Sequence, residues 1–503
     1  MIYFLGSEKG EEKMKNKLLV LAIVFTSILV IPMLPTSIKV HAEPTISMRS
    51  IGFGVTPVKE ECFRPWDEEC ELPEGTVPFN VDMVDAEELC NDGKGVYVAV
   101  LDTGLLSNYL DFFPESMVDI KEEWGIGFTH NVWYDPLGNG NWSIEYIDGT
   151  EYRFSYGPLK DDRGFITHDN GAPDKYGFGW GSGHGTHVTS IITGWQLARD
   201  KSFWVRGVAP KVTIIPVLVL DDWIEFADDG NGWMWTGGTD EMVAAGIRYI
   251  GDLAKKYKVK IVINMSLGGP EPTEMIEDAI DYAICKGVIV VASAGNDGYD
   301  GMGWPGAYPQ VISVAAAGWT QEYLRYYTGT PEPWYWWTDD VPENLWTLDP
   351  LGNEFQVYLT DFSSRPNPDL GQKIWDLDVS APGAGVKGPY KPYGSGQWNY
   401  YSVWGTSQAA PHVAGVAALI LQKYPKVNQF SMELCLKMAG FTNSLTKFCE
   451  EERTAIIFDT FVGDLYPYTW LWKDYGTGLL QADDALFVAK LLFGHCRFVK
   501  CRV

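Results

Sequence analysis

Basic residues are scarce in this chain. Of its 503 residues, 39 are Lys or Arg and 66 are Asp or Glu, so the net charge at pH 7 is −27. Binding to nucleic acid requires a basic face that neutralises phosphates, and we therefore exclude nucleic acid as a partner. No CxxC pair occurs, which argues against a zinc ribbon. A disordered chain is excluded as well, because 14% of the residues are aromatic.

Long apolar runs are almost absent too. One run, residues 18–34, approaches the length of a bilayer span, and Pro32 interrupts it. Lys15 and Lys17 precede this run, and Val40-His41-Ala42 supplies small residues where a signal peptidase cuts. The pattern predicts a secretory leader that is removed after Ala42.

We accordingly divide the N-terminal part into a signal peptide over 1–42, with Met14 as an alternative start, and a short extension or propeptide over 43–75. A cleaved leader predicts a secreted or cell-surface protein without membrane contact. An uncleaved leader would be a membrane anchor. We expect a monomer.

The chain contains eight cysteines, and an even number in an exported protein favours disulfides. Close spacing suggests the pairs Cys62–Cys70, Cys435–Cys449 and Cys496–Cys501, although other pairings stay open. Of the other two, Cys90 and Cys285, the second lies in an apolar run and is interpreted as a buried thiol.

Short β-branched runs alternate with helix-like stretches from about residue 92 onward. The predicted strands are 96–101, 212–220, 259–264, 288–292 and 311–316, and the predicted helices are 185–198, 240–257, 272–285, 406–423 and 480–492. Apolar runs of this length fit strands that are covered on both faces. The alternation therefore predicts an α/β fold with a mainly parallel sheet and helices on both faces.

Three stretches interrupt this rhythm and are interpreted as loop-rich insertions at 119–180, 320–360 and 440–472. The second contains four tryptophans, which form either a small satellite core or a binding face for extended chains. The main domain would cover 76–495, and residues 496–503 would be a C-terminal tail.

Two motifs place an acid and an imidazole at expected strand and helix ends. Asp102-Thr103-Gly104 follows the first predicted strand, and Gly183-His184-Gly185-Thr186-His187-Val188 opens a predicted helix. A carboxylate that ends a buried strand is held rigidly and suits the orientation of an imidazole. The alternatives are an ordinary turn at Asp102 and a metal site formed by His184 and His187.

Two further motifs supply an amide and a hydroxyl. Asn296 follows a predicted strand, where its amide can donate to a developing oxyanion or simply serve a turn. Ser407 precedes Pro411, a residue tolerated in a first helical turn, so Ser407 is expected at a helix N-terminus as a nucleophile or a cap. The surrounding sequence is not the G-x-S-x-G elbow, because position 409 is Ala.

Taken together, these motifs resemble those of the subtilisin-like serine proteases, the subtilase family. The matching stretches are LDTG at 101–104, GHGTHV at 183–188, INMSLGG at 263–269, ASAGN at 292–296, GTSQAAPHVAG at 405–415 and YGTGLLQADDAL at 475–486. The resemblance covers roughly residues 76–495, insertions excepted.

The resemblance implies a catalytic triad and an oxyanion hole. Ser407 would attack the scissile carbonyl, and His184 would accept its proton and pass it to the leaving amine. Asp102 would hold the His184 tautomer and stabilise the imidazolium. Asn296, with the Ser407 backbone N–H, would form the oxyanion hole.

The resemblance also implies a binding site for an extended polypeptide. Ser266, Leu267, Gly268 and Gly269 would line the primary pocket and pair with the substrate backbone, with Gly238 on the opposite wall. Glycines here leave room for an extended peptide. An open pocket floor predicts a preference for a large apolar residue before the cut.

Other implications concern cofactors and maturation. The chemistry needs no cofactor, and Ca²⁺ is a candidate structural ion with ligands from predicted acidic loops at 161–162, 221–222 and 228–231. The 43–75 extension is too short for the inhibitory pro-domain that many secreted relatives carry. The alternatives to a peptidase are a catalytically silent subtilase-fold binding protein and an aromatic-rich protein that binds or cleaves carbohydrate.

Overall fold

The computed structural model describes most of the main domain and two short pieces of the N-terminal extension. The described residues are 48–50, 53–57, 75–87, 89–134, 142–147, 150–167, 182–198, 201, 203–226, 232–320, 357–392, 398–442, 445, 451–458 and 465–493. The predicted signal peptide (1–42) and C-terminal tail (496–503) lie outside them. So does nearly all of the tryptophan-rich insertion at 320–360.

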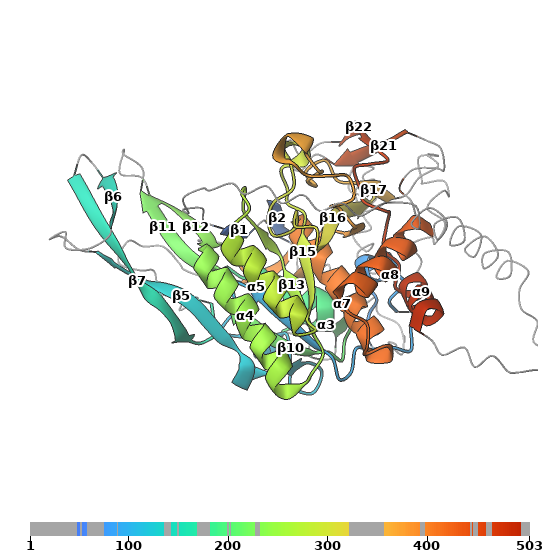
Figure 1. The fold of residues 1–503 in the computed structure, drawn as a ribbon, viewed down its shortest axis with the longest axis horizontal. Helices are drawn as coiled ribbons and strands as arrows, with labels where there is room; N and C mark the ends of the chain where they lie inside the picture. Colours follow the sequence, from blue (N-terminus) through green and yellow to red (C-terminus); the bar gives the residue numbers. More distant parts are fainter. Residues whose placement is uncertain are drawn as a thin grey trace, which may run out of the picture.

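A mainly parallel sheet forms the centre of the molecule (Figure 1). Within the described residues it has eleven strands in the order β17-β16-β15-β13-β3-β10-β5-β7-β6, with β18 paired to β16 and β4 to β10. The parallel strands are β3 (Tyr97–Asp102), β4 (Asp119–Ile120), β5 (Ile126–Tyr134), β10 (Thr213–Leu218), β13 (Ile261–Met265), β15 (Ile289–Ser293), β16 (Ile312–Trp319) and β18 (Val379–Pro382). The predicted α/β fold with a mainly parallel sheet is confirmed, because the apolar runs are buried on both faces.

Helices cover both faces of this sheet. In Figure 1, α4 (Asp240–Tyr257) and α5 (Glu274–Cys285) lie in front of it and α3 (His184–Thr193) behind it, where α3 packs against α7 (Thr406–Lys423). The sequence encodes the start of α4 and α5: the hydroxyls of Thr239 and Thr273 accept from backbone N–H groups of the first turn. The short α2 (Phe79–Asp82) comes before β3 in the chain. α8 (Gln429–Thr442) and α9 (Ala482–Phe493) pack together beside α7.

Two of the predicted loop-rich insertions contain strands, so that part of the prediction was wrong. The described part of 119–180 contributes β4, β5, β6 (Trp142–Ile147) and β7 (Thr150–Arg163), and β5–β7–β6 extend the sheet in antiparallel fashion. Residues 440–472 contain the hairpin of β21 (Glu452–Phe458) and β22 (Leu465–Leu471). Aromatic and β-branched residues in these stretches favour strands despite the surrounding glycine and acid. β17 (Val357–Leu359) closes the opposite edge of the sheet.

Smaller sheets surround the central one. One contains β11 (Asp221–Phe226), β12 (Gly232–Gly238), β1 (Met48–Ser50) and β14 (Leu267–Gly268), and another contains β19 (Val386–Tyr390), β20 (Asn399–Trp404) and β2 (Phe53–Pro57). β8 (Gly194–Gln196) pairs with β9 (Trp204–Arg206), which explains why the predicted helix 185–198 ends early at Thr193. Short 3₁₀ turns η2 (Tyr109–Asp111), η3 (Glu122–Trp124), η4 (Gly298–Asp300) and η5 (Pro368–Leu370) complete the described elements.

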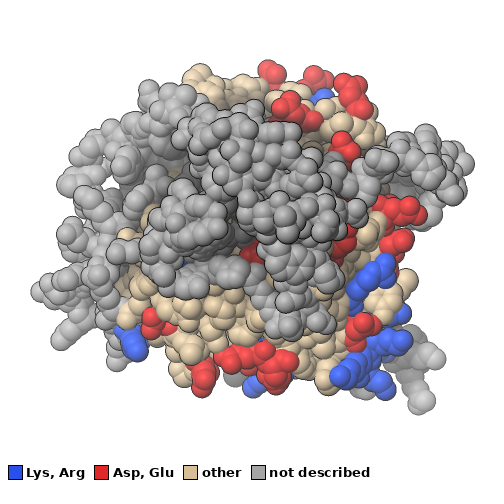
Figure 2. All heavy atoms as spheres, turned by 90° about the vertical axis from the view of Figure 1, so that its left-hand side faces the viewer, with Lys and Arg blue, Asp and Glu red and all other residues tan. Residues whose placement is uncertain are grey.

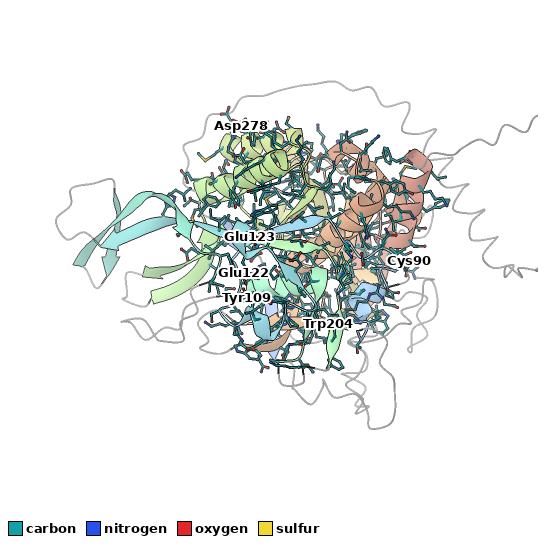
Figure 3. All side chains as sticks on the ribbon, turned by 90° about the horizontal axis from the view of Figure 1, so that it is seen from below. Cys90, Tyr109, Glu122, Glu123, Trp204 and Asp278 are labelled. Carbon is teal, nitrogen blue, oxygen red and sulfur yellow. The ribbon has the colours of Figure 1, made fainter. Side chains whose placement is uncertain are left out.

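Three cysteines are described, and each is a free thiol. Cys90 (Figure 3) and Cys285 are exposed, and Cys435 is buried. The prediction of a buried Cys285 was wrong, because this residue ends α5 where the helix meets solvent. Burial raises the pKa of the Cys435 thiol to about 12. The predicted pair Cys435–Cys449 is not formed, because Cys435 is a free thiol. The pairs Cys62–Cys70 and Cys496–Cys501 lie outside the described residues and stay predictions.

The described surface carries acidic side chains in several separate groups, and Figure 2 shows them on one face with most of the basic side chains in its lower half. Within the part of the chain that the structure describes, no helix has the length and apolar character needed to cross a membrane.

Candidate active site

The four residues singled out by the sequence lie at the ends of core elements. Asp102 is the last residue of β3, His184 is the first residue of α3, Ser407 is in the first turn of α7, and Asn296 follows β15. Carboxyl ends of parallel strands and helix N-termini are where α/β proteins gather reactive groups. Asp102, His184 and Ser407 are 0% exposed, and Asn296 is 5% exposed.

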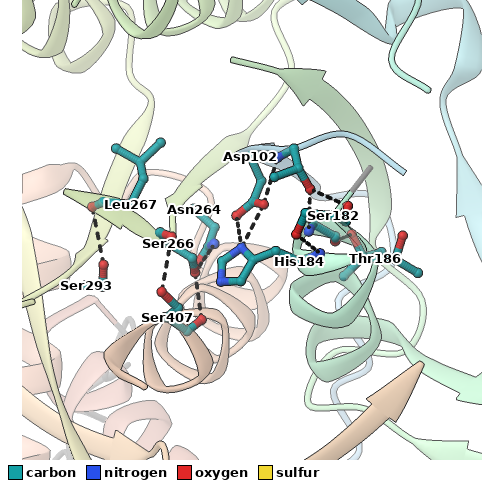
Figure 4. Close-up of polar contacts among 12 residues, drawn as sticks. Asp102, Ser182, His184, Thr186, Asn264, Ser266, Leu267, Ser293 and Ser407 are labelled. Carbon is teal, nitrogen blue, oxygen red and sulfur yellow. Dashed lines mark hydrogen bonds and ion pairs between the residues drawn. The ribbon is translucent and has the colours of Figure 1, made fainter. Parts of the chain in front are cut away.

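Asp102 and His184 form a close pair (Figure 4). The His184 Nδ1 lies 2.8 Å from Asp102 Oδ1 and 3.0 Å from Oδ2, so the ring donates its Nδ1–H to the carboxylate. The backbone N–H of Thr103 donates to Asp102 Oδ1 at 2.7 Å. This carboxylate therefore fixes which ring nitrogen carries the proton and leaves Nε2 as the basic one.

Glycines allow α3 to approach the Asp102 turn. A Cβ at Gly185 would lie 2.3 Å from the Gly104 carbonyl oxygen and 3.2 Å from the Asp102 side chain. Gly104 has φ +79, and a Cβ there would meet the Phe165 carbonyl oxygen at 2.1 Å. Both positions therefore exclude a side chain, Gly185 because of the Asp102 turn and Gly104 because of the Phe165 backbone.

The second nitrogen of His184 remains available. Its Nε2 is buried and has no hydrogen-bond partner among the described residues, and Figure 4 shows the ring between Asp102 and Ser407. An unpaired buried polar atom costs stability, so its presence in a native fold calls for an explanation such as catalysis. A basic nitrogen held toward a hydroxyl is suited to accept a proton from it.

Ser407 is tied to the segment that ends β13. Its Oγ donates to the Ser266 carbonyl oxygen at 3.2 Å, and the Ser266 Oγ donates to the Ser407 carbonyl oxygen at 2.7 Å. The Asn264 Nδ2 in turn donates to the Ser266 Oγ at 3.0 Å. Strand and helix are thus joined directly at the candidate nucleophile.

Pro411 explains why the Ser407 carbonyl needs a hydrogen-bond donor from outside its helix. The expectation that Pro411 lies in the first helical turn was wrong, because α7 begins at Thr406 and Pro411 lies inside it. A helical proline lacks the N–H that would bond the carbonyl four residues earlier, which is that of Ser407. The Ser266 hydroxyl supplies the missing donor.

The amide of Asn296 is oriented by the residue before Ser407. Asn296 Oδ1 accepts from the Thr406 backbone N–H at 2.9 Å and from the Thr406 Oγ1 at 3.0 Å. Thr406 Oγ1 also contacts Gly295, accepting from its N–H at 3.2 Å. Because Oδ1 is engaged in this way, Nδ2 is the group of Asn296 that can donate to a ligand.

The predicted substrate-binding residues lie on either side of a strand from the N-terminal extension. β1 pairs antiparallel with β12, with Met48 opposite Gly238, and with β14, with Arg49 opposite Gly268 and Ser50 opposite Leu267. The Gly269 N–H donates to the Trp304 carbonyl oxygen at 2.8 Å. The structure therefore brings Gly238 and the 266–269 segment together around an extended chain.

Two other histidines near the site are neutral and structural. Burial lowers the pKa of His187 to about 3, and its Nε2 donates to the Val386 carbonyl oxygen at 3.2 Å. Burial also lowers the pKa of His412 to about 3. The alternative of a metal site at His184 and His187 gains no support, because no group of metal-binding side chains occurs among the described residues.

The acidic pairs considered for calcium do not form loops where they are described. Asp221 and Asp222 lie in β11, and residues 161–162 lie in β7. The Asp221 Oδ2 accepts from the Thr129 Oγ1 at 2.5 Å. The expectation that these two pairs lie in loops was wrong, whereas calcium binding itself stays a prediction. Residues 228–231 lie outside the described residues.

Sequence reasoning missed three contributors to the site. Thr406 holds Asn296, and the hydroxyl of Ser266 holds the Ser407 carbonyl, each through a hydrogen bond between distant segments. Asn264 in turn donates to the Ser266 hydroxyl, two residues along the chain. Pro411 carried the only local signal, because its position four residues after Ser407 implies an unsatisfied carbonyl.

A buried serine hydroxyl, an imidazole bound to a carboxylate and an oriented amide are the groups typical of serine hydrolases. Residues 93–446 match the model of the subtilase family of peptidases. This chain belongs to the subtilase family, whose members are serine endopeptidases that need no cofactor for catalysis.

Curated relatives agree with this assignment. The chain is 29% identical over 360 residues to subtilisin of Bacillus sp. strain TA39, a match that covers 70% of this chain and 63% of the relative. It is 28% identical over 360 residues to subtilisin DY of Bacillus licheniformis, with 70% and 87% covered. It is 30% identical over 357 residues to fervidolysin of Fervidobacterium pennivorans, with 67% and 42% covered. The chain thus spans less than two thirds of the first and third relatives.

Proposed function

We propose that this protein is a secreted serine endopeptidase that hydrolyses polypeptides through an acyl-enzyme. The observation that carries the proposal is the Asp102–His184 pair, whose ring has, on the side of Ser407, a buried Nε2 that no described residue pairs with. Family membership supports the same reaction.

The reaction follows from these groups. His184 Nε2 accepts the Ser407 hydroxyl proton as Oγ attacks the scissile carbonyl, and the Asp102 carboxylate stabilises the imidazolium. The imidazolium then gives the proton to the leaving amine. Water attacks the acyl-enzyme by the same route, and Ser407 is regenerated.

The tetrahedral intermediate places negative charge on the former carbonyl oxygen. Asn296 Nδ2 and the Ser407 backbone N–H, at the N-terminus of α7, are the donors that we assign to this oxygen. Thr406 prevents the Asn296 amide from turning its oxygen toward the substrate. The donors are therefore oriented before the charge develops.

Substrate binding is assigned to the residues that flank β1. A polypeptide would lie as a strand between Gly238 and the Ser266–Gly269 segment, with a large apolar residue before the cut. Secretion, removal of the leader after Ala42 and a structural Ca²⁺ ion belong to the same proposal. N-terminal sequencing of secreted material tests the leader, and a chelator that leaves the melting temperature unchanged would count against calcium.

Labelling with an organofluorophosphate tests the nucleophile. We expect a stoichiometric adduct on Ser407, found by mass spectrometry of the tryptic peptides, and loss of casein hydrolysis in Ser407→Ala. Ser431→Ala, in α8 and away from the site, serves as the matched control and should retain both properties. Full casein hydrolysis by Ser407→Ala would place the nucleophile elsewhere.

A further inference from the structure

Asn296 lies in a loop between β15 and η4, and a distant segment of the chain holds this loop in place. Four hydrogen bonds join the loop to the segment that follows β17: from Ser364 N–H to the Gly295 carbonyl oxygen (2.9 Å), from Arg365 N–H to the Gly298 carbonyl oxygen (2.8 Å), from Gly298 N–H to the Phe362 carbonyl oxygen (2.9 Å) and from Asp297 N–H to Ser364 Oγ (3.0 Å). These bonds lie on both sides of Asn296 in the sequence. The position of its amide therefore depends on where the segment after β17 lies.

A buried arginine organises that segment. Arg365 is 2% exposed, and its side chain folds back onto the backbone that precedes it. Its Nη1 donates to the carbonyl oxygen of Asp361 at 2.8 Å and to that of Ser363. Its Nη2 donates to the Thr360 carbonyl oxygen at 3.3 Å. One guanidinium thus binds three carbonyl groups of the segment from which the Asn296 loop is held.

The same guanidinium contacts the β21–β22 hairpin. Its Nη2 donates to the hydroxyl of Tyr468 in β22, and its Nε lies 3.8 Å from the Oδ2 of Asp474, just after β22. Tyr299 follows the Asn296 loop in η4, and its ring centroid lies 4.5 Å from the Arg365 Cζ. The Tyr299 hydroxyl donates to the same Asp474 oxygen at 3.0 Å. The loop, the segment after β17 and the hairpin therefore meet at Arg365.

A charge at this position calls for an explanation beyond stability. A guanidinium stays charged in proteins, and removing it from water often costs more free energy than its ion pairs return, so well-packed apolar side chains stabilise a fold at least as well. A planar group with five N–H donors does, however, fix the direction of each of its partners. A donor that stabilises a transition state needs a fixed direction, because it must be aligned before the charge develops.

We propose that Arg365 is a positioning residue of the oxyanion hole, which acts on the reaction through Asn296 and couples the β21–β22 hairpin to kcat. The proposal rests on the peptidase function proposed above and deepens it. It gives the insertion at 440–472 a role in catalysis, because Tyr468 of this insertion is one of the partners that fix the guanidinium.

The first test separates kcat from KM. Arg365→Met keeps an unbranched side chain and removes the charge and the donors. We expect kcat for peptide hydrolysis to fall by about 10–100-fold and KM to stay within about twofold, because the oxyanion donor is displaced while the substrate-binding residues are not. Arg248→Met is the matched control, since the exposed Arg248 of α4 also lies over a tyrosine ring, and both values should be retained. An unchanged kcat in Arg365→Met would overturn the proposal.

A double-mutant cycle distinguishes positioning from general support of the fold. Arg365→Met is combined with Asn296→Ala, and kcat is measured for the parent, both single variants and the double variant. If Arg365 acts through the Asn296 amide, its replacement should change kcat by no more than about twofold once that amide is absent. Equal losses in both backgrounds would contradict the proposal, because Arg365 would then support activity by another route.

A milder variant tests the hairpin and leaves the buried charge in place. Tyr468→Phe keeps the ring and loses only the hydroxyl that accepts from Arg365. We expect kcat to fall by about two- to tenfold, the equivalent of one hydrogen bond, and this loss should also disappear in the Asn296→Ala background. Tyr282→Phe, which loses an exposed hydroxyl contact with Asp252, should leave kcat unchanged. An unchanged kcat in Tyr468→Phe would refute the role of the hairpin.

Hydrogen exchange tests the same contacts without an enzymatic readout. In an inactive Ser407→Ala background, Arg365→Met should make the amides of 295–298 and 362–365 exchange about tenfold faster, whereas those of α4 should keep the parent rate. Mass spectrometry of peptic peptides measures the rates, and unchanged rates in both segments would count against Arg365 as their organiser. If the wild-type protein cleaves no peptide, the peptidase assignment fails, and these rates still decide whether Arg365 holds the Asn296 loop.

Discussion

Two buried regions of the molecule place an imidazole in very different surroundings. At the start of α3, His184 donates to the carboxylate of Asp102, and its Nε2 has no partner in the part of the chain that the structure describes. Inside α7, His412 donates Nδ1–H to the Gln408 carbonyl oxygen at 2.8 Å, and its Nε2 accepts from the Asn80 Nδ2 at 2.9 Å. Both rings are 0% exposed.

The difference shows what makes a buried histidine chemically useful. At His412 both ring nitrogens are satisfied by neutral groups, so an added proton would have to face the amide N–H of Asn80. At His184 a carboxylate opposes one nitrogen, and the other is free for a new proton. The neighbours of the ring, and not its depth, distinguish a proton acceptor from a packing residue.

Replacing Asp102 should remove the difference between His184 and His412, and we expect it to have the largest effect on kcat. Asp102→Asn keeps the size of the side chain but removes the charge and permits the wrong ring tautomer. We expect kcat to fall by on the order of 10⁴. Peptide hydrolysis at saturating substrate measures it, and Asp278→Asn on the exposed face of α5 (Figure 3) is the control. A loss below tenfold would mean that His184 does not depend on this carboxylate.

Removing the Asn296 amide tests its proposed role as a donor to the oxyanion. Asn296→Ala should lower kcat by on the order of 10²–10³ with little change in KM, a magnitude carried over from the oxyanion asparagine of a relative. Thr406→Val, which keeps the backbone N–H but loses the hydroxyl that binds Asn296, should cause a smaller loss. If KM rather than kcat changes in Asn296→Ala, the amide binds substrate and does not stabilise the transition state.

A third prediction concerns the carbonyl that Pro411 leaves without a helical donor. In an inactive Ser407→Ala background, Ser266→Ala should lower the free energy of unfolding by about 1–3 kcal/mol, because a buried acceptor loses its donor. Urea unfolding measures the change. Adding Pro411→Ala restores an N–H within the helix and should recover part of the loss. Simple additivity of the two substitutions would refute the link between them.

The last prediction concerns the region of His412. His187 and His412 have pKa values of about 3 in the folded protein, below the unfolded value near 6.5, so the unfolded chain binds more protons as the pH falls through this window. Stability is therefore fully present above about pH 6.5 and is lost as the pH falls toward 3, by about 1.4 kcal/mol per pH unit for each residue.

His412→Gln should remove one of these contributions. We expect the unfolding free energy, measured in urea at pH 6.5, 5.5 and 4.5, to fall less steeply than in the parent by about 1.4 kcal/mol per pH unit. We compare the slopes of the unfolding free energy against pH, because the substitution also changes the unfolding free energy by a constant amount at every pH. Parallel slopes would show that His412 is already protonated in the fold.

The sequence predicted the parallel core well because its signals are local. Apolar runs and helical periodicity identified β3, β13 and β15, and α4 and α7 have the predicted bounds. Short glycine-containing motifs at the ends of these elements made Asp102 and His184 identifiable from their sequence neighbours alone. The glycines that mark the motifs are required by backbone contacts.

The remaining features depend on distant partners and had no such signal. β1 and β2 are short strands whose pairing is decided by edges located far along the chain, so the 43–75 extension could only be described by its length. The strands of the first insertion were hidden among glycines and acids, and α8 was not predicted at all. The engagement of Thr406 with Asn296 joins residues 110 positions apart.

The hydrogen bond from Ser266 to the Ser407 carbonyl has a mechanical consequence. Ser266, at one end of this bond, belongs to the segment that we propose binds the polypeptide, and Ser407, at the other end, is the proposed nucleophile. A shift of that segment as it closes on a ligand would be transmitted to the nucleophile without any intervening loop. Binding of the polypeptide and the position of the Ser407 hydroxyl would then change together. A polypeptide that does not bind correctly would leave this hydroxyl misaligned with the scissile carbonyl.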